Sequence, residues 1–169
     1  NGEFTVNIAL IRNHQPVMGI VYVPVTDTSY FGARGIGAWS QQGTAEARSI
    51  KVRRPARQPA EIVGSRSHAN PELASQLAQL GEHELVSMGS SLKFCRIAEG
   101  LADFYPRIGP TCEWDTAAAQ AVVEAAGGQV VTSDGSALAY NTKEAYLNPY
   151  FFVFGDPEKN WLKPFQNVP

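Results

Sequence analysis

Hydroxyl groups and a lysine lie close together in the segment Gly89-Ser90-Ser91-Leu92-Lys93, where a helix is expected to begin. A helix start carries unpaired backbone N–H groups and a partial positive charge, so Ser90 with Lys93 one turn later forms a candidate phosphate site. The alternative is an ordinary serine cap with a solvated lysine, and the pentapeptide alone favours that alternative. Ser90-x-x-Lys93 also matches the nucleophile pattern of penicillin-binding proteins, but the companion Ser-Asp-Asn and Lys-Thr-Gly motifs are absent from the sequence.

A carboxylate, Asp115, follows Trp114 where an alanine-rich helix is expected to begin. Aspartate is a favoured N-cap residue and stabilises a helix by about 1 kcal/mol in that position. It is also a suitable ligand for Mg²⁺, which prefers oxygen and usually takes one or two protein carboxylates together with substrate phosphate oxygens. Asp115 by itself does not decide between the cap and the metal ligand.

Further cationic groups come from two other segments. Arg107 lies at the end of an extended stretch, and Ser65-Arg66-Ser67-His68 follows a short expected strand. Loops beyond the carboxyl ends of strands in α/β sheets are where ligands usually bind. With Lys93, three separate segments supply anion partners although the whole chain has a net charge of −2. Each is weak alone, because exposed cationic side chains are usually just solvated.

The order of elements predicts a layered α/β fold that would position these groups. Apolar residues alternate from Phe4 to Leu10, and two more apolar stretches follow, so residues 1–55 are expected to form an antiparallel meander. Residues 60–155 alternate short strands with amphipathic stretches, which predicts an α/β/α layer. Residues 156–169 are expected to be a tail.

Composition limits the function classes. With 169 residues, 44% of them hydrophobic and 18% charged, the chain has enough apolar material for a core of ordinary size. The slightly acidic balance gives no footprint for a nucleic acid or an anionic membrane surface, and no stretch approaches the roughly 20 apolar residues of a membrane span. Cys95 and Cys112 have no zinc or redox spacing, so two free thiols in a reducing cytoplasm are expected.

Several motifs, taken in order, resemble the inositol-monophosphatase-like superfamily, and most closely its bacterial 3'(2'),5'-bisphosphate nucleotidase branch, which hydrolyses adenosine 3',5'-bisphosphate to AMP. The resemblance extends to about Phe154 and implies a partial αβαβα sandwich. The motifs that carry it are Asn1-Gly2-Glu3-Phe4-Thr5-Val6-Asn7, Gly19-Ile20-Val21-Tyr22-Val23-Pro24, Ser65-Arg66-Ser67-His68, Gly89-Ser90-Ser91-Leu92-Lys93-Phe94-Cys95, Tyr105-Pro106-Arg107 and Trp114-Asp115-Thr116-Ala117-Ala118.

The resemblance also implies roles for individual residues. Asp115 matches the late metal-binding aspartate of the family, which also contacts the substrate, and Mg²⁺ is the implied cofactor. Ser90 and Lys93 match nucleotide-binding positions, and His68 and Arg107 lie in stretches that line the same pocket. The implied reaction is in-line attack of a metal-activated water on a phosphomonoester. The implied setting is the cytoplasm, or a peripheral position at the inner face of the bacterial inner membrane.

One departure from the family pattern matters for activity. The upstream glutamate and the D-P-[IL]-D-G-T motif of the family should lie before Asn1, so this chain is expected to be the C-terminal portion of such an enzyme. Two alternatives stay open: an inositol-phosphate or sugar-phosphate phosphatase, and a catalytically incomplete nucleotide-binding fragment. The face bearing Ile8, Leu10 and Val21 is then expected to be exposed or to recruit another copy, which would give a homodimer.

Overall fold

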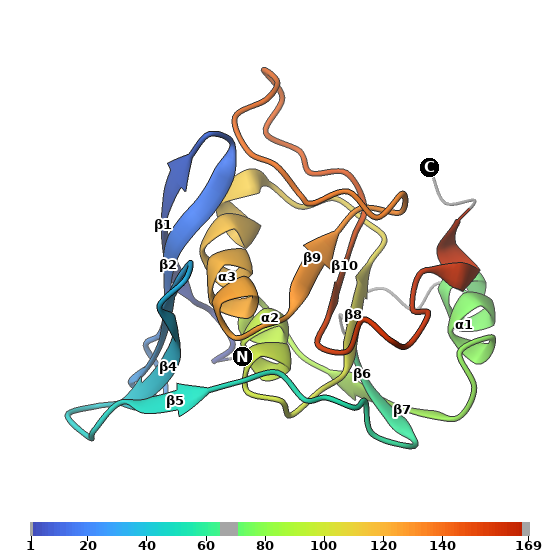
Figure 1. Cartoon of the computed structure of the whole chain (residues 1–169), viewed down its shortest axis with the longest axis horizontal. Helices are drawn as coiled ribbons and strands as arrows, with labels where there is room; N and C mark the ends of the chain where they lie inside the picture. Colours follow the sequence, from blue (N-terminus) through green and yellow to red (C-terminus); the bar gives the residue numbers. More distant parts are fainter. Residues whose placement is uncertain (1, 65–70, 167–169) are drawn as a thin grey trace.

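Two five-stranded sheets with helices between and beside them make up the computed structural model, which describes residues 2–64 and 71–166 (Figure 1). The first sheet is an antiparallel meander in chain order, as the alternation at the start of the sequence predicts. Its strands are β1 (Val6–Arg12), β2 (Gln15–Val23), β3 (Thr28–Ala33), β4 (Gly37–Gln42) and β5 (Arg48–Ile50).

The second sheet is mixed, with strand order β7-β6-β8-β10-β9. The pairs β6–β7 and β6–β8 are parallel, whereas β10 runs antiparallel to both of its neighbours. Its strands are β6 (Ala60–Gly64), β7 (His83–Ser87), β8 (Phe104–Arg107), β9 (Gln129–Val131) and β10 (Phe151–Phe154). The predicted layered α/β fold is therefore confirmed.

Helices α2 (Leu92–Ala98) and α3 (Glu113–Ala125) lie between the two sheets, while α1 (Pro71–Ala78) lies on the far side of the second sheet (Figure 1). The central helices join both sheets into one apolar cluster. A second cluster packs Leu77 of α1 against the opposite face of the second sheet. None of the helices within residues 2–64 and 71–166 is long and apolar enough to cross a membrane.

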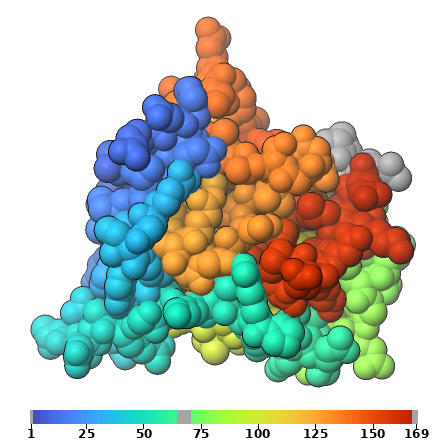
Figure 2. Space-filling view, viewed as in Figure 1, coloured from blue at the N-terminus to red at the C-terminus, as the bar shows by residue number. Residues whose placement is uncertain are grey.

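Small residues allow α3 to pack directly on the first sheet. A Cβ atom at Gly19 would lie 2.1 Å from the carbonyl oxygen of Ala118, so β2 and α3 touch backbone to backbone at this point. In the space-filling view, α3 and the neighbouring chain lie between the first strands and the C-terminal part of the chain (Figure 2). The close contact between Gly19 and Ala118 fixes which face of the first sheet is inside.

The large apolar residues of β1 face outward, as predicted for Ile8 and Leu10. Ile8 and Leu10 are 61% and 55% exposed, whereas Ala9 and Ile11 on the other face pack towards the core. The expectation that Val21 shares the exposed face is wrong, because Val21 is fully buried. Val21 pairs with Asn7, whereas Ile8 pairs with Ile20, and successive residues of a strand point to opposite faces.

The segment after residue 155 packs tightly on the second sheet. Trp161 and Phe165 are both fully buried, with Trp161 stacked on Phe104 at a ring-centroid distance of 4.8 Å. A short 3-10 helix, η1 (Lys163–Phe165), carries Phe165 against Phe152 at 4.7 Å. The residues expected to form a tail thus contribute two large side chains to the second cluster.

A buried carboxylate ties the connection between the sheets to the core. Asp103 has a fully buried side chain that accepts two hydrogen bonds from the Arg53 guanidinium, at 2.8 and 2.7 Å. The backbone N–H groups of Arg57 and Glu61 donate to the same carboxylate. All four lone-pair directions therefore have donors, which is the condition for burying a charge of this kind.

Candidate active site

Lys93 is not the solvated side chain that the cautious interpretation of its motif expects. It is only 5% exposed, and its Nζ donates to the carbonyl oxygens of Met88 at 3.1 Å and Ser90 at 2.9 Å. The ammonium also lies 5.2 Å from the centre of the Tyr105 ring, within the range of a cation–π contact. Since an ammonium has three donors and two of them have acceptors among residues 2–64 and 71–166, one N–H is left for a ligand as far as this part of the chain shows.

The charge on Lys93 is held at some cost. Burial, and to a smaller extent the nearby Arg107 guanidinium, lower the pKa of Lys93 to about 8, while the carboxylate of Glu3 acts in the opposite direction. An anion bound beside Lys93 and Arg107 would offset the cost of the buried positive charge and weaken the repulsion between the two cations. The two cations therefore form a site whose electrostatics favour a negatively charged ligand.

The side chains of the two serines in the motif form hydrogen bonds with the start of the chain and do not cap the helix. Ser91 occupies the N-cap position of α2, but its side chain makes no capping hydrogen bond and donates to Asn7 Oδ1 at 2.8 Å. Ser91 is therefore the cap by position, but its hydroxyl does not cap the helix. Ser90 has a positive φ of 53°, and its hydroxyl lies 2.6 Å from that of Thr5.

Arg107 ends β8 with part of its guanidinium unpaired. Its Nη2 donates to the carbonyl oxygen of Pro110 at 2.8 Å, while its Nε is buried and has no hydrogen-bond partner among the described residues. A buried donor without a partner costs about 1–3 kcal/mol, so this N–H is suited to a ligand oxygen.

Asp115 is the third residue of α3, not its cap. The helix begins at Glu113 after Cys112, and the Asp115 Oδ2 accepts a hydrogen bond from the Cys112 backbone N–H at 3.0 Å. Cys112 in turn accepts from the Asp115 backbone, which makes a reciprocal capping box. This arrangement fixes the carboxyl group by one oxygen and presents the other at the exposed helix start.

Four of the five residues singled out from the sequence line one cavity of about 230 Å³, bounded by β8, the start of α3 and the loop before α2. These four are Ser90, Lys93, Arg107 and Asp115. The fifth, His68, lies outside the described residues, as does the rest of the Ser-Arg-Ser-His motif. The sequence therefore predicts the composition of this cavity from three separate segments.

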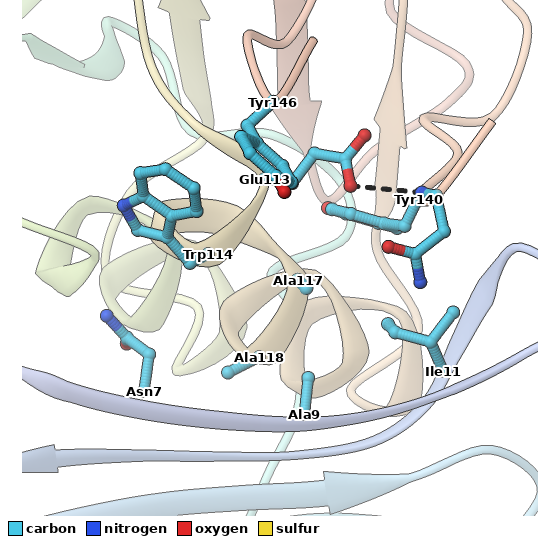
Figure 3. A pocket seen from close by; sticks show the side chains of 10 residues that line it. Asn7, Ala9, Ile11, Glu113, Trp114, Ala117, Ala118, Tyr140 and Tyr146 are labelled. Carbon is cyan, nitrogen blue, oxygen red and sulfur yellow. Dashed lines mark hydrogen bonds between the residues drawn. The ribbon is translucent and has the colours of Figure 1, made fainter. Parts of the chain in front are cut away.

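A second cavity of about 270 Å³ lies on the other side of the α3 start (Figure 3). Trp114 and Tyr146 stand above a floor that includes Ala117 and Ala118, and Glu113 accepts a hydrogen bond from the Asn141 backbone N–H at 3.0 Å. Because Asp115 and Trp114 are adjacent in α3, the carboxylate lines the first cavity while the indole lines the second.

The described residues fit Mg²⁺ only in part. Asp115 offers a hard oxygen ligand beside two cations that suit phosphate oxygens. Within residues 2–64 and 71–166, however, no group of three or more His, Cys, Asp or Glu side chains lies close enough to hold a metal ion. Asp115 could therefore be one ligand of a magnesium site, but the described residues do not bring three such side chains together.

Sequence reasoning missed the contribution of the first residues to this site. Glu3 accepts a hydrogen bond from the Gly89 backbone N–H at 2.6 Å, and Thr5 and Asn7 contact the two serines. Asn7 also lines the cavity itself. Thr5 and Asn7 alternate with large apolar residues along the strand, and this alternation shows that they share one face. Such polar residues are usually taken to face solvent, and for this reason the pattern did not point to the site.

The cavity is lined by two cations and a carboxylate, and it lies in a layered α/β structure with two sheets and two helices between them (Figure 1). Residues 1–158 match the profile of the inositol monophosphatase family. The chain belongs to this family.

Within this family, the chain is similar to curated proteins named as nucleotidases. The chain is 52% identical over 153 residues to the 3'(2'),5'-bisphosphate nucleotidase CysQ of Escherichia coli and 51% identical to that of Salmonella typhimurium, in each case over 90% of this chain and 61% of the relative. The chain thus spans about three fifths of the length of these curated relatives.

Solved structures agree with the fold. The structure of CysQ from Bacteroides thetaiotaomicron matches with a TM-score of 0.81 and 43% identity, over 91% of this chain and 63% of that one. An inositol monophosphatase from Anabaena matches with a TM-score of 0.75 and 25% identity, over 98% of this chain and 64% of that one.

Proposed function

We propose that this chain supplies the anion-binding part of a Mg²⁺-dependent phosphomonoesterase that converts adenosine 3',5'-bisphosphate to AMP and phosphate. The observation that carries the proposal is the convergence of Lys93, Arg107 and Asp115 on one cavity. Two cations next to one carboxylate suit a phosphate ester with a metal ion bound beside it. The relatives named as 3'(2'),5'-bisphosphate nucleotidases support the choice of a nucleotide.

Each residue has a separate role in this proposal. Lys93 and Arg107 bind and orient phosphate oxygens through the free ammonium N–H and the unpaired Nε. Asp115 provides one ligand for Mg²⁺ and contacts the phosphate from the helix start. When bound, the metal would lower the pKa of the attacking water and neutralise charge on the leaving oxygen. The contribution of the two cations is positioning of the substrate.

The cellular setting and the assembly belong to the same proposal. The two cysteines are unpaired, Cys95 buried and Cys112 half-buried, as expected for a protein of the reducing cytoplasm. The partner is a small nucleotide bisphosphate. The exposed apolar face of the first sheet is the surface through which two copies of this chain would associate.

A phosphatase acting on inositol or sugar phosphates is the competing function, because the family profile does not distinguish the two. The discriminating experiment uses a longer polypeptide that carries these residues together with the acidic segment that the resemblance places before them. Its kcat/KM is measured with adenosine 3',5'-bisphosphate and with an inositol monophosphate at saturating Mg²⁺. We expect the nucleotide to be preferred; a preference for the inositol ester would overturn the nucleotide assignment.

A further inference from the structure

The loop that carries Ser90 is held by a chain of side-chain hydrogen bonds from the start of the first sheet. Thr5 Oγ1 lies 2.6 Å from Ser90 Oγ and 2.7 Å from Ser91 Oγ. Ser91 Oγ donates to Asn7 Oδ1 at 2.8 Å, and Asn7 Nδ2 donates back to Thr5 at 3.3 Å. Thr5 is thus the centre of the network.

Counting protons fixes the direction of each bond. The single hydroxyl proton of Ser91 is used in the bond to Asn7, so Thr5 must donate in the bond between Thr5 and Ser91. The single proton of Thr5 is then used as well, and Ser90 must donate to Thr5. The Ser90 hydroxyl proton is therefore used in the bond to Thr5, which leaves only its lone pairs for other partners.

The same contact holds an unfavourable backbone conformation. Ser90 has a φ of 53°, a region that costs a residue with a side chain of order 1 kcal/mol or more and persists only where the surroundings enforce it. Its carbonyl oxygen is one of the two acceptors for Lys93. A change in the Ser90 conformation would therefore also move the acceptor that positions the ammonium.

We propose that Thr5 is a positioning residue for the anion-binding cavity: its hydroxyl fixes the orientation of Ser90 and Ser91 and, through the Ser90 backbone, the place of Lys93. Thr5 is half-buried outside the ring of cavity-lining side chains, so it acts through the serines and not by touching the ligand. This inference rests on the proposed function.

The test compares four variants of the full chain with the wild type by titration calorimetry with AMP, the product of the proposed reaction, without divalent metal. Thr5→Val keeps the shape and removes the hydroxyl, whereas Thr5→Ser keeps the hydroxyl. Thr28→Val is the matched control, because it removes a threonine hydroxyl from β3 whose hydrogen bonds within the described part of the chain are with Thr26, and Thr28 does not line the cavity. Thermal unfolding of each variant reports on stability, and Thr5→Ala repeats the comparison with a smaller side chain.

We expect Thr5→Val and Thr5→Ala to bind AMP roughly three- to tenfold more weakly, the effect of one or two neutral hydrogen bonds. Thr5→Ser and Thr28→Val should bind like the wild type. Wild-type affinity in Thr5→Val, or loss in Thr28→Val as large as in Thr5→Val, would overturn the positioning role alone. A wild-type chain that does not bind AMP would overturn the proposed function, and this inference with it.

Discussion

Replacement of Lys93 tests the electrostatics of the cavity most sharply. Lys93→Ala removes the free N–H that we assign to a phosphate oxygen, a charge-assisted contact of about 1.5–3 kcal/mol, and so should reduce kcat/KM of the longer polypeptide by about 10- to 150-fold. Stability should change less, because the loss of two hydrogen bonds to loop carbonyls is offset by relief of a buried cation. Lys93→Arg keeps the charge and is the control.

The pKa of Lys93 gives the pH dependence of the same step. Because burial and Arg107 lower this pKa to about 8, the ammonium is largely protonated at neutral pH and loses its proton as the pH rises above 8. Wild-type kcat/KM should then fall about tenfold per pH unit on the alkaline side, since only the charged form binds the anion. Lys93→Arg should lack this fall, because a guanidinium stays protonated.

The choice of substrate makes the result specific. A nucleotide bisphosphate has a second phosphate that an inositol monophosphate lacks, and Lys93 is the group we expect to contact it. The assay is steady-state kinetics of Lys93→Ala and Lys93→Arg with both substrates, from pH 6 to 10. Equal losses for the two substrates, or an alkaline limb unchanged in Lys93→Arg, would refute the reasoning and leave Lys93 as a structural residue of the loop.

Three other predictions follow from the same contacts. Asp115→Asn should abolish turnover and weaken Mg²⁺ binding, but it should change the free energy of unfolding by no more than about 0.5 kcal/mol, because an amide oxygen can still accept from Cys112. Kinetics and denaturant unfolding of this variant are the measurements, and wild-type turnover would show that Asp115 is only part of a helix cap. Asp103→Ala should destabilise the chain by about 3–5 kcal/mol, because it leaves Arg53 and two backbone N–H groups without an acceptor; a loss under 1 kcal/mol in urea unfolding would contradict the assigned burial. A purified polypeptide of these 169 residues should self-associate through Ile8 and Leu10, and the double variant Ile8→Lys, Leu10→Lys should be monomeric by light scattering; equal masses for the two would argue against this face.

The fold could be predicted from sequence where one pattern dominated. The antiparallel meander follows from the alternation of apolar residues at the start of the chain, and the second, mixed sheet with its helices follows from the later strand–helix alternation. The sequence predicts the exposure of Ile8 and Leu10 but not the burial of Val21, because the inner face is set by close contact with α3 and carries small and polar residues such as Ala9 and Asn7 beside Ile11. Burial of large apolar residues, the usual guide, points to the opposite face here.

The sequence predicts which residues line the cavity, but not the hydrogen bonds that hold these residues in place. Ser90, Lys93, Arg107 and Asp115 follow from motif spacing and family resemblance, and they line one cavity. The details of both helix starts differ from the simple cap, because local rules for helix starts do not include the side chains that approach from distant strands. The Ser91 hydroxyl donates its hydrogen bond to Asn7, more than 80 residues away in the sequence, and Asp115 takes part in the capping box from the third position of α3.

The most direct test of the proposed active site is phosphate release from adenosine 3',5'-bisphosphate with Mg²⁺, measured side by side on the 169-residue chain and on the longer polypeptide. One carboxylate holds Mg²⁺ only weakly, so the described residues alone should give no metal-dependent release, whereas the longer polypeptide should release one phosphate per nucleotide and leave AMP. Equal turnover by the 169-residue chain, or none by either polypeptide, would contradict the assignment of Asp115, Lys93 and Arg107 to one part of a shared catalytic site.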